Sequence, residues 1–195
     1  MPQSINMVDA VFDVSGELLT SDYSAALWQA LLTHLPALSS NHYIGVIPLR
    51  TVASAAGLLL PKRAKLTLRL PSELAEHHTA LSDKTLRLGA STLQLGKGKL
   101  RTIQPYPTLH AHWVSGDADE VQFLSDVSAQ LAELDIAGKL LCGLRTQRDG
   151  KYGYSLVIHD LKPDASLRLQ YNGLGTDRQH GCGIFVPYKA ITDLE

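Results

Sequence analysis

Apolar and polar residues alternate with the periods of strands and helices along the whole chain, and the first half shows seven such segments. Helices are predicted where apolar residues recur every three or four positions, and strands where they alternate. The expected strands are 7–14, 43–52 and 65–70, and the expected helices are 21–35 and 71–81. Two short alternating runs, 85–88 and 91–95, flank Gly89-Ala90 and predict a hairpin.

The second half repeats this order of elements. Strands are expected over 108–114, 139–145, 152–158 and 184–188, and helices over 119–134 and 163–171. Strand, helix, strand, strand, helix, strand is the order of the ferredoxin-like fold. The pattern therefore predicts an α+β protein with tandem ferredoxin-like (RRM-like) domains, in which two antiparallel sheets are each backed by helices. Pro105 and Pro107 interrupt the pattern, so we place the domains at 1–102 and 103–195.

Composition allows two small packed domains, and the distribution of charge along the chain indicates a phosphate-containing partner. The chain has 195 residues, 45% of them hydrophobic, and a net charge of −1. Segment 61–101 holds nine basic and three acidic residues, whereas 117–135 holds six acidic residues and no lysine or arginine. This asymmetry favours a phosphate-binding face and a solvated far face. Two ordinary solvated surfaces are the alternative.

Targeting and cysteine usage favour a cytoplasmic protein. No stretch reaches the length of a membrane-spanning helix, and the N-terminus lacks the basic and apolar regions of a signal peptide. Cys142 and Cys182 are far apart and form no metal-binding spacing. We therefore expect reduced thiols, and no motif in the sequence predicts a metal or another cofactor.

A glycine-rich run starts at Gly173 and leads into an apolar strand-like segment. It places four glycines within eleven residues, with Arg178 and His180 between them. Glycine permits positive φ and close approach of the backbone to a ligand, and successive free N–H groups can form an anion site. The spacing is neither GxxxxGK[ST] nor GxGxxG. The run suits a phosphate-rich partner, or else it is a helix end followed by a turn.

The element order and the glycine run together resemble a known family. The match is carried by 166–175 (SLRLQYNGLG), 181–187 (GCGIFVP), 8–12 (VDAVF), Leu35-Pro36 and 45–48 (GVIP). Over nearly its whole length the chain resembles the CRISPR-associated RNA endonucleases of the RAMP superfamily. Within that superfamily it is most similar to the MYXAN-type branch of the repeat-RNA processing enzymes.

The resemblance implies a metal-independent endoribonuclease that cuts precursor CRISPR RNA within its repeats to give mature guide RNA. The ribose 2′-OH attacks the adjacent phosphate and leaves a 2′,3′-cyclic phosphate and a 5′-OH. Expected partners are the repeat RNA hairpin, the mature guide RNA and other subunits of a CRISPR effector complex. A non-catalytic RNA-binding subunit of such a complex is the alternative. A small-molecule-binding regulatory domain is a further one, because fold does not fix function.

The implied reaction needs a base for the 2′-OH and an acid for the leaving 5′-oxygen, and histidine suits both roles. The resemblance places a histidine at the end of the first helix or in the following loop, where this chain has His34 and His42. We favour His42 because its loop is polar, with Tyr43 assisting through its hydroxyl; an ordinary surface histidine is the alternative. His34 is the second candidate, although the helix dipole alone explains a histidine there.

Basic residues around strand 65–70 are expected to contact RNA phosphates. Lys65, Thr67 and Arg69 fall on one face of this strand and leucines on the other, which predicts a cationic surface over a buried one. A solvated strand face is the alternative. The full set of predicted RNA contacts is Lys62, Arg63, Lys65, Arg69, Gly173, Gly175, Arg178, His180, Gly181 and Gly183.

His110 and His112 alternate on the polar face of strand 108–114. The sequence supplies no further metal ligand beside them, so we interpret them as exposed strand histidines. No aromatic pair of the RNP type stands out on a strand. Recognition of a folded hairpin through its shape and backbone is therefore favoured over stacking of single-stranded bases.

Overall fold

The computed structural model describes residues 5–188 and divides into two compact units. The first unit comprises the chain up to Ile103 together with Arg178–Gly181, and the second comprises the rest. Residues 178–181 come late in the sequence but belong to the first unit. The predicted domain boundary between residues 102 and 103 did not anticipate that this later segment belongs to the first unit.

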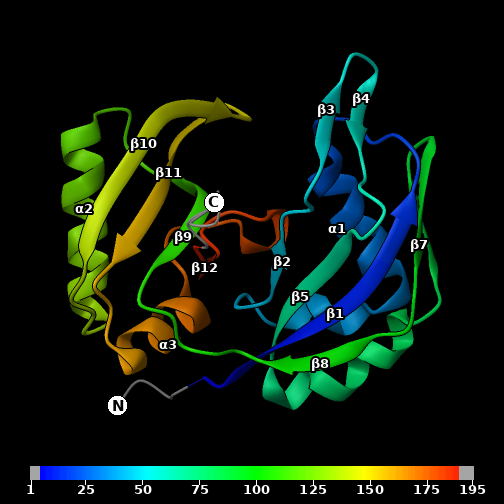
Figure 1. Ribbon diagram of the computed structural model, residues 1–195, viewed down its shortest axis with the longest axis horizontal. Coiled ribbons are helices and arrows are strands. Elements are labelled where there is room, and N and C mark those ends of the chain that lie inside the picture. Colours follow the sequence, from blue (N-terminus) through cyan, green and yellow to red (C-terminus); the bar gives the residue numbers. More distant parts are fainter. Residues whose placement is uncertain (1–4, 189–195) are drawn as a thin grey trace, which may run out of the picture. The chain divides into compact units, whose positions relative to one another are not determined.

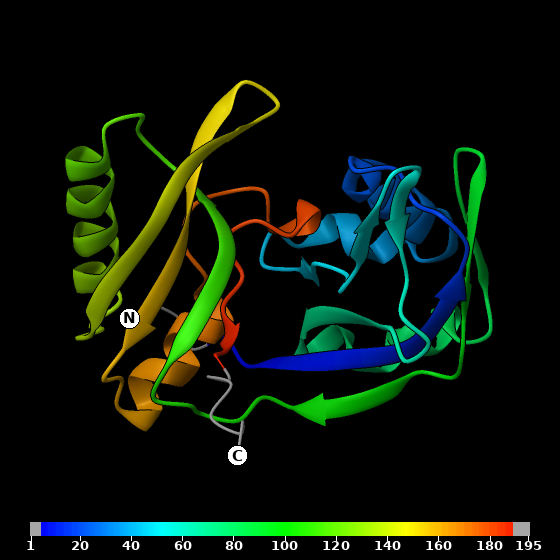
Figure 2. The ribbon, with the colours of Figure 1, turned by 45° about the horizontal axis from the view of Figure 1, so that its top comes forward.

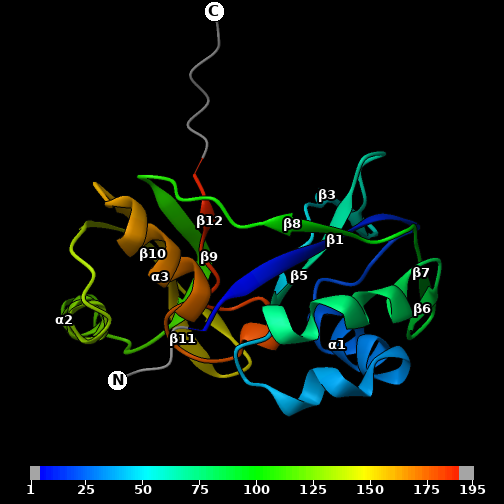
Figure 3. The ribbon, with the colours of Figure 1, turned by 90° about the horizontal axis from the view of Figure 1, so that it is seen from below.

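The first unit has a ferredoxin-like sheet (Figure 1). Its main elements are β1 (Met7–Gly16), α1 (Tyr23–His34), β2 (Gly45–Ile47), β5 (Lys65–Pro71), the 3-10 helix η2 (Ser72–Leu81) and β8 (Lys99–Thr102). The strands run antiparallel in the order β2-β5-β1-β8. Figure 3 shows α1 and η2 on the same side of this sheet. That side is the core, where Ala10 and Phe12 of β1 meet Leu27 and Leu31 of α1.

Shorter elements complete the first unit. They are η1 (Pro36–Ser40), β3 (Val52–Ser54), β4 (Gly57–Leu59), β6 (Thr85–Leu88) and β7 (Ser91–Leu95). The predicted hairpin of β6 and β7 is confirmed, and β7 also pairs with the end of β1. The expected strand 43–52 is shorter in the structure, because β2 ends at Ile47, before Pro48. Val52 belongs to a separate strand, β3, which pairs with β4 in a hairpin that the sequence pattern did not predict.

Two predictions for the first unit need correction. The segment 72–81 is a 3-10 helix instead of an α-helix, and its side chains bond to carbonyls three residues back. The His78 ring donates to Ala75 at 2.7 Å and the Thr79 hydroxyl to Glu76 at 3.1 Å. The fourth sheet strand is β8, which the sequence pattern did not predict, and the hairpin of β6 and β7 is an addition beside it.

The second unit follows the predicted order of elements closely. It contains β9 (Leu109–Ser115), α2 (Glu120–Glu133), β10 (Lys139–Arg148), β11 (Lys151–His159), α3 (Pro163–Asn172) and β12 (Val186–Pro187). Its strands lie in the ferredoxin-like order β10-β11-β9-β12. Figure 2 shows the β10–β11 hairpin continuing past the end of β9.

Local signals explain where these elements begin and turn. The side chain of Asp119 accepts a hydrogen bond from the Gln122 amide at 3.3 Å and caps α2. Asp149 and Gly150 both have positive φ, at 48° and 78°, as the tight turn between β10 and β11 requires. None of the helices within residues 5–188 is long and apolar enough to cross a membrane.

Candidate active site

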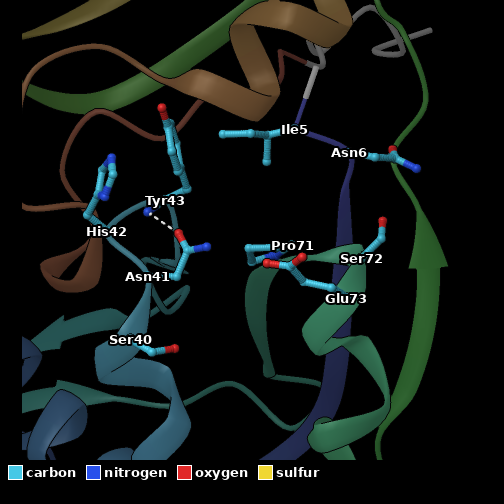
Figure 4. A pocket seen from close by; sticks show the side chains of 9 residues that line it. All are labelled: Ile5, Asn6, Ser40, Asn41, His42, Tyr43, Pro71, Ser72 and Glu73. Atoms are coloured by element: carbon cyan, nitrogen blue, oxygen red, sulfur yellow. Dashed lines mark hydrogen bonds between the residues drawn. The ribbon is translucent and has the colours of Figure 1, made fainter. Parts of the chain in front are cut away.

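A groove of about 610 Å³ opens in the first unit where three segments meet. One wall precedes β1, a second lies between η1 and β2, and a third joins β5 to η2. Figure 4 shows the lining side chains, which are Ile5, Asn6, Ser40, Asn41, His42, Tyr43, Pro71, Ser72 and Glu73. The Ser72 amide donates to the Asn6 carbonyl at 2.9 Å and ties two of the walls together.

His42 and Tyr43 form the turn that leads into β2. The Asn41 side chain accepts a hydrogen bond from the Tyr43 amide at 2.9 Å, which fixes the turn locally. His42 is exposed, and its ring centroid lies 4.2 Å from that of Tyr43. The groove therefore presents an accessible imidazole next to a phenol, with the carboxylate of Glu73 on the opposite wall (Figure 4). Such groups can accept and donate protons.

Arg178 supports this turn from within the first unit. Its Nε donates to the Tyr43 carbonyl at 3.0 Å, and the residue is only 5% exposed. Burial, followed by the nearby charge of Arg69, lowers the pKa of Arg178 to about 10, so the guanidinium stays protonated at neutral pH. The expectation of an accessible RNA contact at Arg178 is wrong, because this side chain is enclosed and acts as a positioning residue.

His34 lies outside the groove. It occupies the last turn of α1, and its Nε2 donates to the Thr85 carbonyl at 3.3 Å. The structure thus brings His42 and Tyr43 together and places His34 in a separate contact with β6. Asn41, Ser72 and Glu73 are groove residues that the sequence interpretation missed. The start of a helix predicted at Pro71-Ser72 was the only signal for the last two.

The expected cationic face of β5 is wrong at Arg69, which is 1% exposed. Asp9 of β1 stands directly opposite Arg69 in the sheet. The Arg69 guanidinium donates to both Asp9 carboxylate oxygens, at 2.9 and 3.1 Å. Arg101 of β8 lies 3.6 Å from the same carboxylate. The carboxylate therefore draws Arg69 into a buried ion pair, and Thr67 is buried as well.

The start of β5 carries the accessible cations. Lys62, Arg63 and Lys65 are exposed. Lys65 pairs with Asp13 and lowers the pKa of that carboxyl, first through the hydrogen bond and then through its charge. Within the part of the chain that the structure describes, neither Lys62 nor Arg63 makes an ion pair. The sequence from 23 to 72 contains no aspartate or glutamate, so no acidic residue lies near them along the chain.

The glycine run has the predicted backbone geometry but not the predicted free N–H groups. Gly173, Gly175, Gly181 and Gly183 have φ values of 63°, 72°, 84° and 67°. Each of their amides donates within the protein, to Leu169, Gln130, Arg178 and Trp113 in that order. The expected anion site is therefore wrong at these four glycines, because no amide is left for a phosphate. His180, between them, is half-buried.

Close approach explains why two of these positions are glycine. A Cβ on Gly183 would lie 1.8 Å from the carbonyl oxygen of Leu174. A Cβ on Gly181 would lie 2.9 Å from Pro48 and 3.3 Å from the Val46 carbonyl. Any larger residue would also have to adopt positive φ. These two glycines are thus required by the backbone conformation and by close packing.

Comparisons with known proteins identify the family. The model of the Cas6 Crispr family matches residues 8–190. A CRISPR-associated endonuclease Cas6 from Myxococcus xanthus (strain DK1622) is 34% identical over 186 residues, which cover 92% of this chain and 81% of that protein. The predicted resemblance is therefore confirmed at the level of the family.

Solved structures agree with the fold. A CRISPR associated protein Cas6 matches with a TM-score of 0.66 and 11% identity, over 94% of this chain and 100% of that one. A Cas6-related protein from Pyrococcus furiosus matches with a TM-score of 0.64 and 11% identity, over 92% and 98%. These likenesses confirm the tandem ferredoxin-like architecture. Together with the family match over most of its length, they show that the chain belongs to the Cas6 family of CRISPR-associated proteins.

Proposed function

We propose that the protein is an endoribonuclease that cleaves precursor CRISPR RNA within its repeats and leaves a 2′,3′-cyclic phosphate. The observation that carries the proposal is an exposed histidine, His42, in a groove of a chain that is 34% identical to a CRISPR-associated endonuclease. The proposed partners are the repeat RNA hairpin and the mature guide RNA. The proposed location is the cytoplasm, which the free thiols of Cys142 and Cys182 support.

In the proposed mechanism, His42 accepts the proton of the ribose 2′-OH. The 2′-oxygen forms a bond to the adjacent phosphorus, and the bond from phosphorus to the 5′-oxygen breaks. The departing oxygen takes a proton from the Tyr43 hydroxyl, whose ring lies beside that of His42. Arg178 contributes by holding the Tyr43 carbonyl and hence the turn. Holding the reacting groups in place lowers the entropic part of the barrier.

Lys62 and Arg63 are proposed to hold RNA phosphates away from the site of cleavage. They precede Lys65, where β5 begins, whereas the groove lies at Pro71, where β5 ends. A strand rises about 3.3 Å per residue, so these two ends are roughly 20 Å apart. The bound RNA would therefore run along this distance, and contacts at Lys62 and Arg63 would position it without reading its sequence.

The proposed activity is tested by incubating the protein with its own repeat RNA in EDTA. We expect cleavage at one position, with a 2′,3′-cyclic phosphate on the upstream fragment. A terminus that resists phosphatase until acid opens the cyclic phosphate would identify the product. Binding of the repeat RNA without cleavage, with or without divalent ions, would support the RNA-binding subunit instead.

Removal of the accessible cations is expected to weaken RNA binding in a salt-dependent way. For Lys62→Ala with Arg63→Ala, we expect the slope of log K against log[salt] to become shallower by up to about 1.8, because two phosphate contacts are lost. Fluorescence anisotropy with labelled repeat RNA over a salt series measures this slope. Lys84→Ala with Arg87→Ala removes the same two charge types from the β6 region and is the matched control. An equal change in both double variants would contradict a specific contact.

A further inference from the structure

The sheet of the second unit has one face that α2 and α3 do not cover. Its core face packs Leu109, Ala111 and Leu156 against Phe123 of α2 and Leu169 of α3. On the opposite face, one row crosses all four strands, because residues directly opposite each other share a face. The row consists of Leu141, Val157, His110 and Val186. Leu141 is 59% exposed and the other three are half-buried, so this row is partly accessible to solvent.

Three aromatic rings follow one another beside this row. The centroid of the His110 ring lies 5.5 Å from that of Tyr188 and 5.0 Å from that of His112. Both pairs meet edge to face, at 78°. Tyr188 is 48% exposed and His112 is exposed too. His110, His112 and Tyr188 form what we call the ring platform. The sequence did not indicate it, because Tyr188 follows a different strand.

The surroundings of the ring platform favour neutral rings beside a cation. Desolvation is the main cause that lowers the pKa of both His110 and His112, which favours the neutral form of each ring. The charge of Arg148 lowers the pKa of His112 further. Arg148 also lies over the Trp113 ring, with its Cζ 5.3 Å from the centroid. Within residues 5–188, the buried Nδ1 of His110 has no hydrogen-bond partner.

We propose that the ring platform binds a single-stranded segment of RNA by stacking its bases, with Arg148 beside a phosphate. Accessible aromatic rings such as those of Tyr188 and His112 offer stacking partners to unpaired bases, whereas paired bases in a stem are covered by their neighbours. The proposal rests on RNA as the substrate class, as proposed above, and adds an unpaired flank as a feature that the protein recognises.

Binding of a short labelled oligoadenylate, measured by anisotropy, tests the ring platform. Stacking contributes roughly five- to hundredfold in affinity per base. We expect the triple variant His110→Ala, His112→Ala, Tyr188→Ala to bind at least tenfold more weakly. His110→Phe with His112→Phe should keep most of the affinity, because rings remain. Tyr106→Ala, which removes another exposed tyrosine of this unit, should change nothing. Undiminished binding by the triple variant would overturn the proposal.

A second substrate separates this proposal from the proposed function. A repeat hairpin trimmed of its single-stranded flanks should be cut by the triple variant at the parental rate. If the parental protein cuts this hairpin while oligoadenylate binding is indifferent to the rings, the ring platform is wrong and the endoribonuclease stands. If it cuts nothing while oligoadenylate binding requires the rings, the endoribonuclease is wrong and the single-strand site stands. Unchanged thermal unfolding of the triple variant shows that any lost binding is local.

Discussion

Replacement of His42 by alanine is expected to slow RNA cleavage by roughly 10²- to 10⁴-fold, the contribution that one general base makes. The imidazole is exposed in the groove and lies against the Tyr43 ring, so its removal would leave the 2′-OH without the proposed base. Binding should change little, because the proposed phosphate contacts lie elsewhere. Single-turnover cleavage at saturating protein, with affinity measured separately, gives both quantities.

His34→Ala is the matched control for this prediction. It removes a histidine from the same region of the first unit, but its ring is engaged with the Thr85 carbonyl and does not line the groove. Its cleavage rate should stay near the parental value. A parental rate in His42→Ala would remove His42 from the mechanism. A larger loss of rate in His34→Ala would make His34 the candidate base.

Loss of Asp9 is expected to have the largest effect on stability. The carboxylate is 3% exposed and receives two hydrogen bonds from Arg69, while the charge of Arg178 acts on the same region. Removing one partner of a buried ion pair leaves an uncompensated charge and costs about 3–5 kcal/mol. Asp9→Ala should therefore lower the free energy of unfolding by about this amount, measured by urea denaturation.

Asp13→Ala provides the comparison on the same strand. Asp13 pairs with Lys65 at the surface, where solvent screens the interaction, so this substitution should have little effect on stability. If the Asp9 and Asp13 variants unfold at the same urea concentration, the buried pair contributes nothing beyond a surface pair. Impaired cleavage in an Asp9→Ala protein that remains folded would further indicate that the buried charges of Asp9 and Arg69 help Arg178 to hold the turn at Tyr43.

Periodicity predicted the second unit well and the first unit less well, for a physical reason. In the second unit both helices and the strands β9 and β11 have one buried and one more exposed side, so the apolar pattern predicts these elements directly. β8 is exposed at all four of its positions and therefore shows no alternation of apolar and polar residues. Its basic composition is typical of a linker. Only its pairing with β1, a long-range contact, makes it a strand.

The site shows the same limit. Alternation placed Arg69 on the face opposite the leucines of β5, but the register that sets Asp9 against it is decided by pairing between distant strands. Positive φ at the glycines followed from composition. Their hydrogen-bond acceptors, such as Gln130 and the Trp113 carbonyl, come from other parts of the chain. The type of each residue and its local backbone conformation were thus predictable from the sequence. The residues that each of them contacts across the fold were not.

The return of Arg178–Gly181 to the first unit limits how this protein can be dissected. A fragment that stops at residue 103 would contain His42 and Tyr43 but would lack the guanidinium that holds the Tyr43 carbonyl. The two halves repeat one architecture without being separable modules. Fusing the first half to another protein would therefore require that residues 178–181 be grafted with it.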